Sequence, residues 1–203
     1  MAKSVWFAQA GGPEVLEVRN VEVGAPGPGE VRIRHMAVGL NFADTYFRTG
    51  YYPVPLPNGM GVEASGIIEA VGEGVDGFAP GDRVTYTGSP LGAYSSERVM
   101  SANSLIHLPD EIGHETAAAM TMRGLTAAYL LRRIDPFLRP GDAILLHAAA
   151  GGVGLIVSQW ANLLGLRVIG TVSNSEKADL ALAHGCHEVI QYTKEDVPAR
   201  VRE

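Results

Sequence analysis

A glycine-rich stretch, AAAGGVG, follows an apolar run in the second half of the chain and carries the clearest chemical pattern in the sequence. It nearly matches the dinucleotide-binding pattern G-x-G-x-x-G, with Ala149 at the first glycine position and Gly151 and Gly154 in register. Residues without a Cβ let backbone N–H groups approach a phosphate, and a helix N-terminus attracts its negative charge. The pattern therefore predicts a pyrophosphate-binding turn, and a glycine turn that serves packing alone is the alternative.

The segments around this turn must position it, and they alternate between strand and helix patterns. AILLHAAA is typical of a strand buried on both faces, RVIGTVS and HEVIQY of two more strands, and SEKADLALAHG and KEDVPARVRE of helices. The helix after the turn has an apolar face made of Val153, Ile156, Val157, Trp160, Leu163 and Leu164. This order predicts a parallel sheet with right-handed crossovers, the context in which the glycine pattern binds phosphates.

The residues after the second of these strands discriminate between NADH and NADPH. Enzymes that use NAD place an Asp or Glu there for the ribose hydroxyls. No acid occurs between Arg167 and Ser175, and Ser173, Asn174 and Lys177 occupy this region instead. Because hydroxyls, an amide and an ammonium suit a 2′-phosphate that an acid would repel, we expect NADPH as the cofactor. A solvated surface lysine is the alternative role for Lys177.

The first 110 residues have a different pattern, with short β-rich runs separated by glycine and proline turns. One short helix is expected to begin after Asn41 and to end at Gly50. A longer helix follows Gly113, with a break at Gly124 as one alternative. We therefore expect two domains, residues 1–125 and residues 126–203.

Composition excludes several classes of function. The formal net charge of -6 argues against a nucleic-acid partner bound through a basic surface. Cys186 is the only cysteine, so an internal disulfide and a cysteine-built zinc site are excluded. No apolar run approaches the ~20 residues of a membrane span. We expect a soluble, cytoplasmic protein without membrane or nucleic-acid partners.

Several longer stretches carry a family resemblance: GGPEVL, GLNFADTYFRTGYYP, GVEASGIIEAVGEGVDGFAPGDRV, RGLTAAYLL and HAAAGGVGLIVSQWA. In this order the chain resembles the NADPH:quinone oxidoreductases, the zinc-free, zeta-crystallin-like branch of the medium-chain dehydrogenases and reductases. The resemblance implies an α/β fold in which a GroES-like β-rich domain precedes a partial Rossmann domain with a doubly wound parallel sheet. It also implies hydride transfer from NADPH to quinones by a homodimer.

The resemblance also indicates a metal-free site. Zinc-dependent relatives carry a Cys where this chain has Asn41 and a His where it has Met60. Neither residue is a zinc ligand, and Glu63 alone does not make a site. We therefore expect catalysis to rest on positioning and on polar groups around the cofactor.

The resemblance assigns residues to two overlapping sets. Asn41, Tyr46 and Tyr52 are expected at the substrate. The set expected near NADPH consists of Asn41, Phe42, Asp44, Tyr46, Thr126, Tyr129, Gly151, Gly152, Val153, Gly154, Ser173, Asn174, Lys177 and Tyr192. Structural roles are the alternatives for some of them, such as a helix cap for Asn41 and dipole compensation for Asp44. His35 and His147 are expected to be hydrogen-bonded core residues.

Three functions stay open at this stage. Quinone reduction is the first, and an enoyl or alkenal reductase of the same superfamily, in which a tyrosine can supply a proton, is the second. A non-catalytic nucleotide-binding fragment is the third. Because family members continue for roughly another domain's length, we expect the chain to be truncated at its C-terminus.

Overall fold

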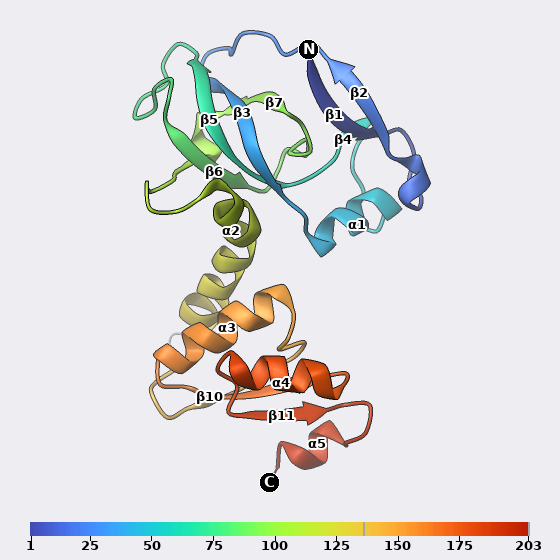
Figure 1. Ribbon diagram of the computed structural model, residues 1–203, viewed down its shortest axis with the longest axis vertical. Helices are drawn as coiled ribbons and strands as arrows, with labels where there is room; N and C mark the ends of the chain where they lie inside the picture. Colours follow the sequence, from blue (N-terminus) through green and yellow to red (C-terminus); the bar gives the residue numbers. More distant parts are fainter. Residues whose placement is uncertain (136, 203) are drawn as a thin grey trace. The chain divides into compact units, whose positions relative to one another are not determined.

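The computed structural model describes residues 1–135 and 137–202, and the chain forms two compact units, Met1–Met122 and Arg123–Glu203 (Figure 1). The boundary lies inside helix α2 (His114–Tyr129), the same helix that contains the boundary expected after residue 125. Within the described residues, no helix combines the length and the apolar character that crossing a bilayer requires.

The first unit contains two antiparallel sheets, with strand orders β2-β1-β4 and β7-β3-β5-β6-β8. Their strands are β1 (Ala2–Phe7), β2 (Glu17–Val21), β3 (Glu30–Gly39), β4 (Asn58–Gly59), β5 (Glu63–Val71), β6 (Arg83–Thr87), β7 (Glu97–Ser101) and β8 (Ile106–His107). Short 3-10 turns lie at Pro13–Val15 and Ala102–Ser104. The antiparallel sheets agree with the expected β-rich domain, and β5 is the central strand of the larger one.

Strand β3 shows how the alternating pattern builds the core of this unit. Val31 and Ile33 are fully buried and pack with Ile68 and Tyr86 from neighbouring strands. The ring nitrogens of His35 lie 2.6 Å from the Ser95 carbonyl and 2.9 Å from the Tyr86 hydroxyl. Desolvation by burial lowers the pKa of His35 to about 4, so this histidine is a neutral, hydrogen-bonded residue, as predicted.

Helix α1 (Phe42–Thr49) has the bounds that the sequence predicts. Asn41 is its N-cap residue, and the Asn41 backbone N–H donates to the Asp44 carboxylate at 2.8 Å. Gly50 ends the helix with φ of 80°, a left-handed conformation that glycine adopts without steric cost. The helix therefore begins directly after β3, and Asn41 and Asp44 both belong to its first turn.

The second unit contains a parallel sheet in the order β11-β10-β9. Its elements are β9 (Ala143–Leu146), α3 (Gly152–Leu163), β10 (Arg167–Val172), α4 (Ser175–Ala183), β11 (Glu188–Gln191) and α5 (Val197–Arg200). Helices α3 and α4 cover the same face of the sheet, as sequential right-handed crossovers require (Figure 1). These elements form the part of a Rossmann domain that the strand and helix order predicts.

The alternative of a helix break at Gly124 is excluded, and three expectations about this part of the chain are wrong. Helix α2 continues through Gly124 and passes into a π-helical turn at Leu130–Ile134. Strand β9 is an edge strand here, so Leu145 is 42% exposed rather than buried. Leu163 is 85% exposed because the buried side of α3 is formed by Gly154, Val157, Ser158 and Ala161, and Leu163 lies on roughly the opposite side of the helix. His147 is also exposed, with Nδ1 3.0 Å from Thr171 Oγ1, because it follows the end of β9.

Candidate functional site

The glycine-rich turn joins β9 to α3 and brings the backbone close to the helix. Gly151 is the N-cap of α3, and Gly154 lies in its first turn. A Cβ on Gly154 would lie 2.6 Å from the Ala149 carbonyl oxygen and closer still to the Ala148 carbonyl oxygen. Only glycine fits there, so the turn and the helix are packed backbone against backbone.

The alanine at the first glycine position is explained by the backbone. Ala149 is fully buried, and Ala148 is the only described non-glycine residue with positive φ, at 53°. The left-handed conformation thus falls one residue before the position that the glycine pattern assigns to the first glycine. Gly170 of β10 provides room, because a Cβ there would lie 2.6 Å from the Ala149 Cβ.

A pocket of about 140 Å³ lies at the carboxyl ends of the parallel strands, beside this turn. Its lining consists of Ala148, Ala150, Gly151, Thr171, Val172, Ser173, Lys177 and Tyr192. The lining contains no Asp or Glu. This is the edge of an open α/β sheet at which ligands bind, and its polar groups come from the turn, β10, α4 and the end of β11.

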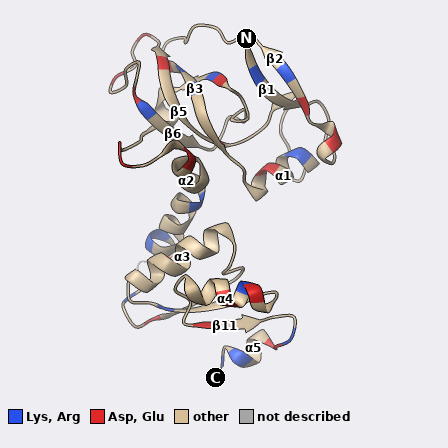
Figure 2. Ribbon diagram, viewed as in Figure 1, with Lys and Arg blue, Asp and Glu red and all other residues tan. Residues whose placement is uncertain are grey.

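The residues expected to discriminate between NADPH and NADH surround the first turn of α4. Asn174 caps this helix, and its Oδ1 accepts the Lys177 backbone N–H at 2.9 Å. The Lys177 side chain is exposed and makes no hydrogen bond or ion pair within residues 1–135 and 137–202. Figure 2 shows basic and acidic residues side by side on α4, so the helix has mixed charge around this ammonium.

Helix α2 adds a residue that the sequence did not single out. A Cβ on Gly152 would lie 2.8 Å from Arg123 Nε, so the guanidinium lies against the first residue of α3. No local pattern distinguishes this arginine from a surface residue. Of the other α2 residues expected near the cofactor, Thr126 is half-buried and Tyr129 is 50% exposed.

Three polar residues of the first unit are buried at the junction of β3, α1 and β5. Asn41, Asp44 and Glu63 are 6%, 3% and 0% exposed. Asn41 Nδ2 donates to Glu63 Oε2 at 2.7 Å, and the Tyr94 hydroxyl donates to Asp44 Oδ2 at 2.8 Å. Burial raises the pKa of Asp44, and burial together with the Asp44 carboxylate raises the pKa of Tyr94.

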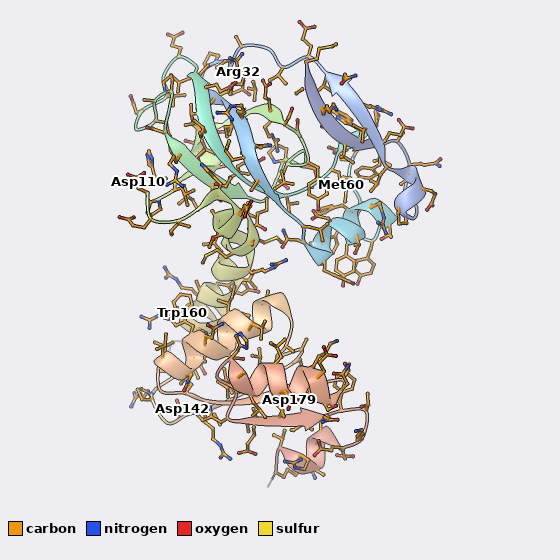
Figure 3. All side chains as sticks on the ribbon, in the orientation of Figure 1. Arg32, Met60, Asp110, Asp142, Trp160 and Asp179 are labelled. Atoms are coloured by element: carbon orange, nitrogen blue, oxygen red, sulfur yellow. The ribbon has the colours of Figure 1, made fainter. Side chains whose placement is uncertain are left out.

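The positions that hold zinc ligands in the related enzymes have other roles in this unit. Asn41 is hydrogen-bonded to Glu63, and Met60, labelled in Figure 3, packs in an apolar cluster with Phe7, Val62 and Leu91. Within the described ranges, no group of three or more His, Cys, Asp or Glu side chains is arranged to hold a metal ion. At these positions Asn41 therefore has a hydrogen-bonding role and Met60 a packing role.

An aromatic cluster lies on α1 and the loop after it. The Tyr46 ring centroid is 5.3 Å from that of Phe42 and 5.2 Å from those of Tyr51 and Tyr52. Phe42 and Tyr51 are more than 70% exposed, and Tyr52 is 44% exposed. The structure therefore brings the rings of Phe42, Tyr46 and Tyr52 together, and it adds Tyr51, which the sequence did not single out.

Comparison with known proteins finds a matching family model in each unit. Residues 27–110 match the alcohol dehydrogenase GroES-like domain, and residues 152–203 match the zinc-binding dehydrogenase family. Quinone oxidoreductase from Pseudomonas aeruginosa is 55% identical over 204 residues, which cover 100% of this chain and 62% of that protein. The chain is similar over its whole length to quinone oxidoreductases. It spans about 62% of the length of the curated relatives that it matches.

Solved structures of quinone oxidoreductases have the same fold. Quinone oxidoreductase from Pseudomonas syringae superposes with a TM-score of 0.96 at 52% identity, covering 99% of this chain and 62% of that one. Escherichia coli quinone oxidoreductase, solved in complex with NADPH, gives a TM-score of 0.95 at 46% identity, covering 98% and 61%. A 2-haloacrylate reductase from Burkholderia sp is 46% identical over 210 residues, covering 100% of this chain and 62% of that protein.

Proposed function

We propose that the protein binds NADPH and uses it to reduce quinones without a metal ion. The observation that carries this proposal is the pocket beside the glycine turn, which has Lys177 and Ser173 in its lining and no acid. The sequence similarity supports it, since quinone oxidoreductases from three bacteria are 47% to 55% identical to the chain. Escherichia coli quinone oxidoreductase also binds NADPH in its solved structure.

The residues beside the glycine turn fit the phosphate groups of such a cofactor. Gly151 and Gly152 leave the N-terminus of α3 accessible to a pyrophosphate, and the helix dipole favours its charge. Arg123 is a further candidate, because its guanidinium lies against Gly152. Lys177 and Ser173 would hold the 2′-phosphate through an ammonium and a hydroxyl. Tyr192, at the same pocket, would contact the adenosine end through its ring.

The remaining predicted cofactor residues have narrower roles in this proposal. Val153 and Gly154 shape the first turn of α3, where Gly154 sets the distance between helix and turn. Asn174 orders the first turn of α4 and so fixes the backbone that carries Lys177. Thr126, Tyr129, Phe42 and Asp44 stay predicted contacts of the cofactor, and Asp44 also holds the Asn41 backbone N–H.

For the chemical step, NADPH supplies a hydride when bound. The chain's own residues then need to orient the acceptor and to exclude water. Asn41 provides a rigid amide, and Tyr46 and Tyr52 provide ring faces and hydroxyls for a planar acceptor. Because a quinone accepts a hydride readily, this proposal requires no strong acid and no Lewis acid from the protein.

Reduction of an activated carbon–carbon double bond is the second candidate. It is favoured by the similarity to 2-haloacrylate reductase, at 46% identity over the whole chain. Such a reaction needs a proton donor after hydride transfer, and the rings of Tyr46, Tyr51 and Tyr52 form one cluster whose hydroxyls are candidates for this role. The two candidates therefore share a cofactor site and differ in the acceptor.

Side-by-side turnover assays separate these candidates. With NADPH in excess, we expect benzoquinones and naphthoquinones to be reduced with a kcat/KM at least about tenfold above that of 2-haloacrylates and α,β-unsaturated aldehydes. A higher kcat/KM for the alkenes would replace quinone reduction by the second candidate. Binding of NADPH without turnover of either acceptor would contradict both and support a non-catalytic nucleotide-binding role. A homodimer and a cytoplasmic location remain predictions.

A further inference from the structure

Thr171, in strand β10, is bonded to the chain on both sides of Ala148. Its hydroxyl Oγ1 lies 3.0 Å from His147 Nδ1, and its backbone carbonyl accepts the Ala149 N–H at 3.2 Å. Thr171 is 2% exposed, so its hydroxyl needs a hydrogen-bond partner inside the protein. One buried residue therefore holds the residue before Ala148 and the residue after it.

Ala148 itself has a backbone conformation that needs such support. Its φ is 53°, in the left-handed region, where the Cβ of an L-residue comes too close to the following carbonyl oxygen. This conformation costs free energy in alanine, though not in glycine, and it persists only where the surrounding structure holds it. The two bonds of Thr171 hold it, because they fix the residues on either side.

The conformation of Ala148 sets where helix α3 begins. The Ala148 carbonyl accepts the Gly151 N–H at 2.8 Å, and Gly151 is the N-cap residue of α3 and lines the pocket beside the turn. The N–H groups of the first helical turn have no acceptor within the helix, so they are available to a bound anion. A different backbone conformation at Ala148 would therefore turn these N–H groups away from the pocket.

We propose that His147 is a positioning residue of the phosphate-binding turn. Through its bond to Thr171 it holds Ala148 in the left-handed conformation, and so keeps the N-terminus of α3 aligned with the pyrophosphate of NADPH. The neutral imidazole forms this bond in either tautomer, because Nδ1 donates in one and accepts in the other. The inference rests on the proposed function, and its residues all belong to the second unit.

Loss of this bond should weaken the pyrophosphate end of the site and spare the 2′-phosphate end. In His147→Leu we expect the Kd of NADPH to rise about tenfold. Adenosine 2′-monophosphate has no pyrophosphate, and its phosphate is assigned to Lys177 and Ser173. Its Kd should therefore stay within about twofold of wild type. Calorimetric titration measures both constants, and a role that merely stabilises the unit would weaken both ligands alike.

Two rescue variants test the bond and the backbone strain separately. His147→Asn keeps a donor and an acceptor near the position of Nδ1, so its Kd for NADPH should lie within about threefold of wild type. Glycine adopts the left-handed conformation without the bond, so Ala148→Gly should reduce the effect of His147→Leu to less than about threefold. His184→Leu is the matched control, because His184 Nδ1 lies 2.8 Å from the Leu180 carbonyl, outside the pocket lining, and should change neither Kd.

These outcomes separate positioning from a merely structural role. A selective loss of NADPH affinity in His147→Leu that both rescue variants recover supports the proposal. Unchanged NADPH binding in His147→Leu, an equal loss for both ligands, or a loss that either rescue variant leaves in place overturns it, while NADPH binding by the wild-type chain stands. A wild-type chain that does not bind NADPH overturns the proposed function and this inference with it, so the two failures are distinguishable.

Discussion

Lys177→Ala is expected to raise the Kd of NADPH by about 10- to 100-fold and to change that of NADH by less than about threefold. The reason is that the ammonium would make a charge-assisted hydrogen bond to the 2′-phosphate, which NADH lacks. Lys177 lines the pocket at the end of β10, and no acid lines it. Fluorescence titration of both cofactors against the variant and the wild type measures the two constants.

Lys194→Ala is the control for loss of a positive charge in the same unit. Lys194 follows β11, is exposed and does not line the pocket. It should change the Kd of either cofactor by less than about twofold, because an exposed charge outside the site is screened by salt. Equal effects of Lys177→Ala on NADPH and NADH would refute the assignment of this lysine to the 2′-phosphate.

Gly154→Ala is expected to lower the stability of the second unit by about 3 kcal/mol and to weaken NADPH binding at least about tenfold. The added methyl group would meet the Ala148 and Ala149 carbonyl oxygens, which belong to the backbone and have no rotamer to change. Helix α3 would therefore move away from the turn and take its N-terminus out of line with the phosphates. Thermal unfolding and NADPH titration measure the two effects.

Gly24→Ala is the matched control for an added methyl group. A Cβ on Gly24 meets no atom within 4 Å, and its φ is not positive. We expect its unfolding temperature to stay within about 2 °C of wild type. A Gly154→Ala variant that is as stable as Gly24→Ala and binds NADPH normally would show that this glycine is not needed for the packing of helix and turn.

Local sequence patterns were sufficient to predict the elements that position the candidate site. Asn41 and Gly50 marked the ends of α1 because capping and left-handed φ favour particular residue types. The glycine turn was recognised in the same way, because only glycine tolerates the close approach of backbone at Gly154. Such features depend on the residue itself and on near neighbours in sequence, which is why one sequence was enough to predict them.

Contacts between distant segments escaped the sequence analysis. The bond from Met122 N–H to Glu63 joins positions 59 residues apart, and nothing in either segment predicts it. Arg123 beside Gly152 is another contact of this kind. The exposure of Leu145 was missed for a related reason, since an apolar run indicates a strand without saying which strands flank it.

The central claim is that this chain carries an NADPH site, and direct titration of the wild-type chain with NADPH and NADH tests it most simply. Quenching of intrinsic tryptophan fluorescence or a rise in cofactor fluorescence gives both dissociation constants. We expect saturable binding of NADPH with a Kd at least about tenfold below that of NADH. Equal affinity for the two cofactors, or tighter binding of NADH, would contradict it.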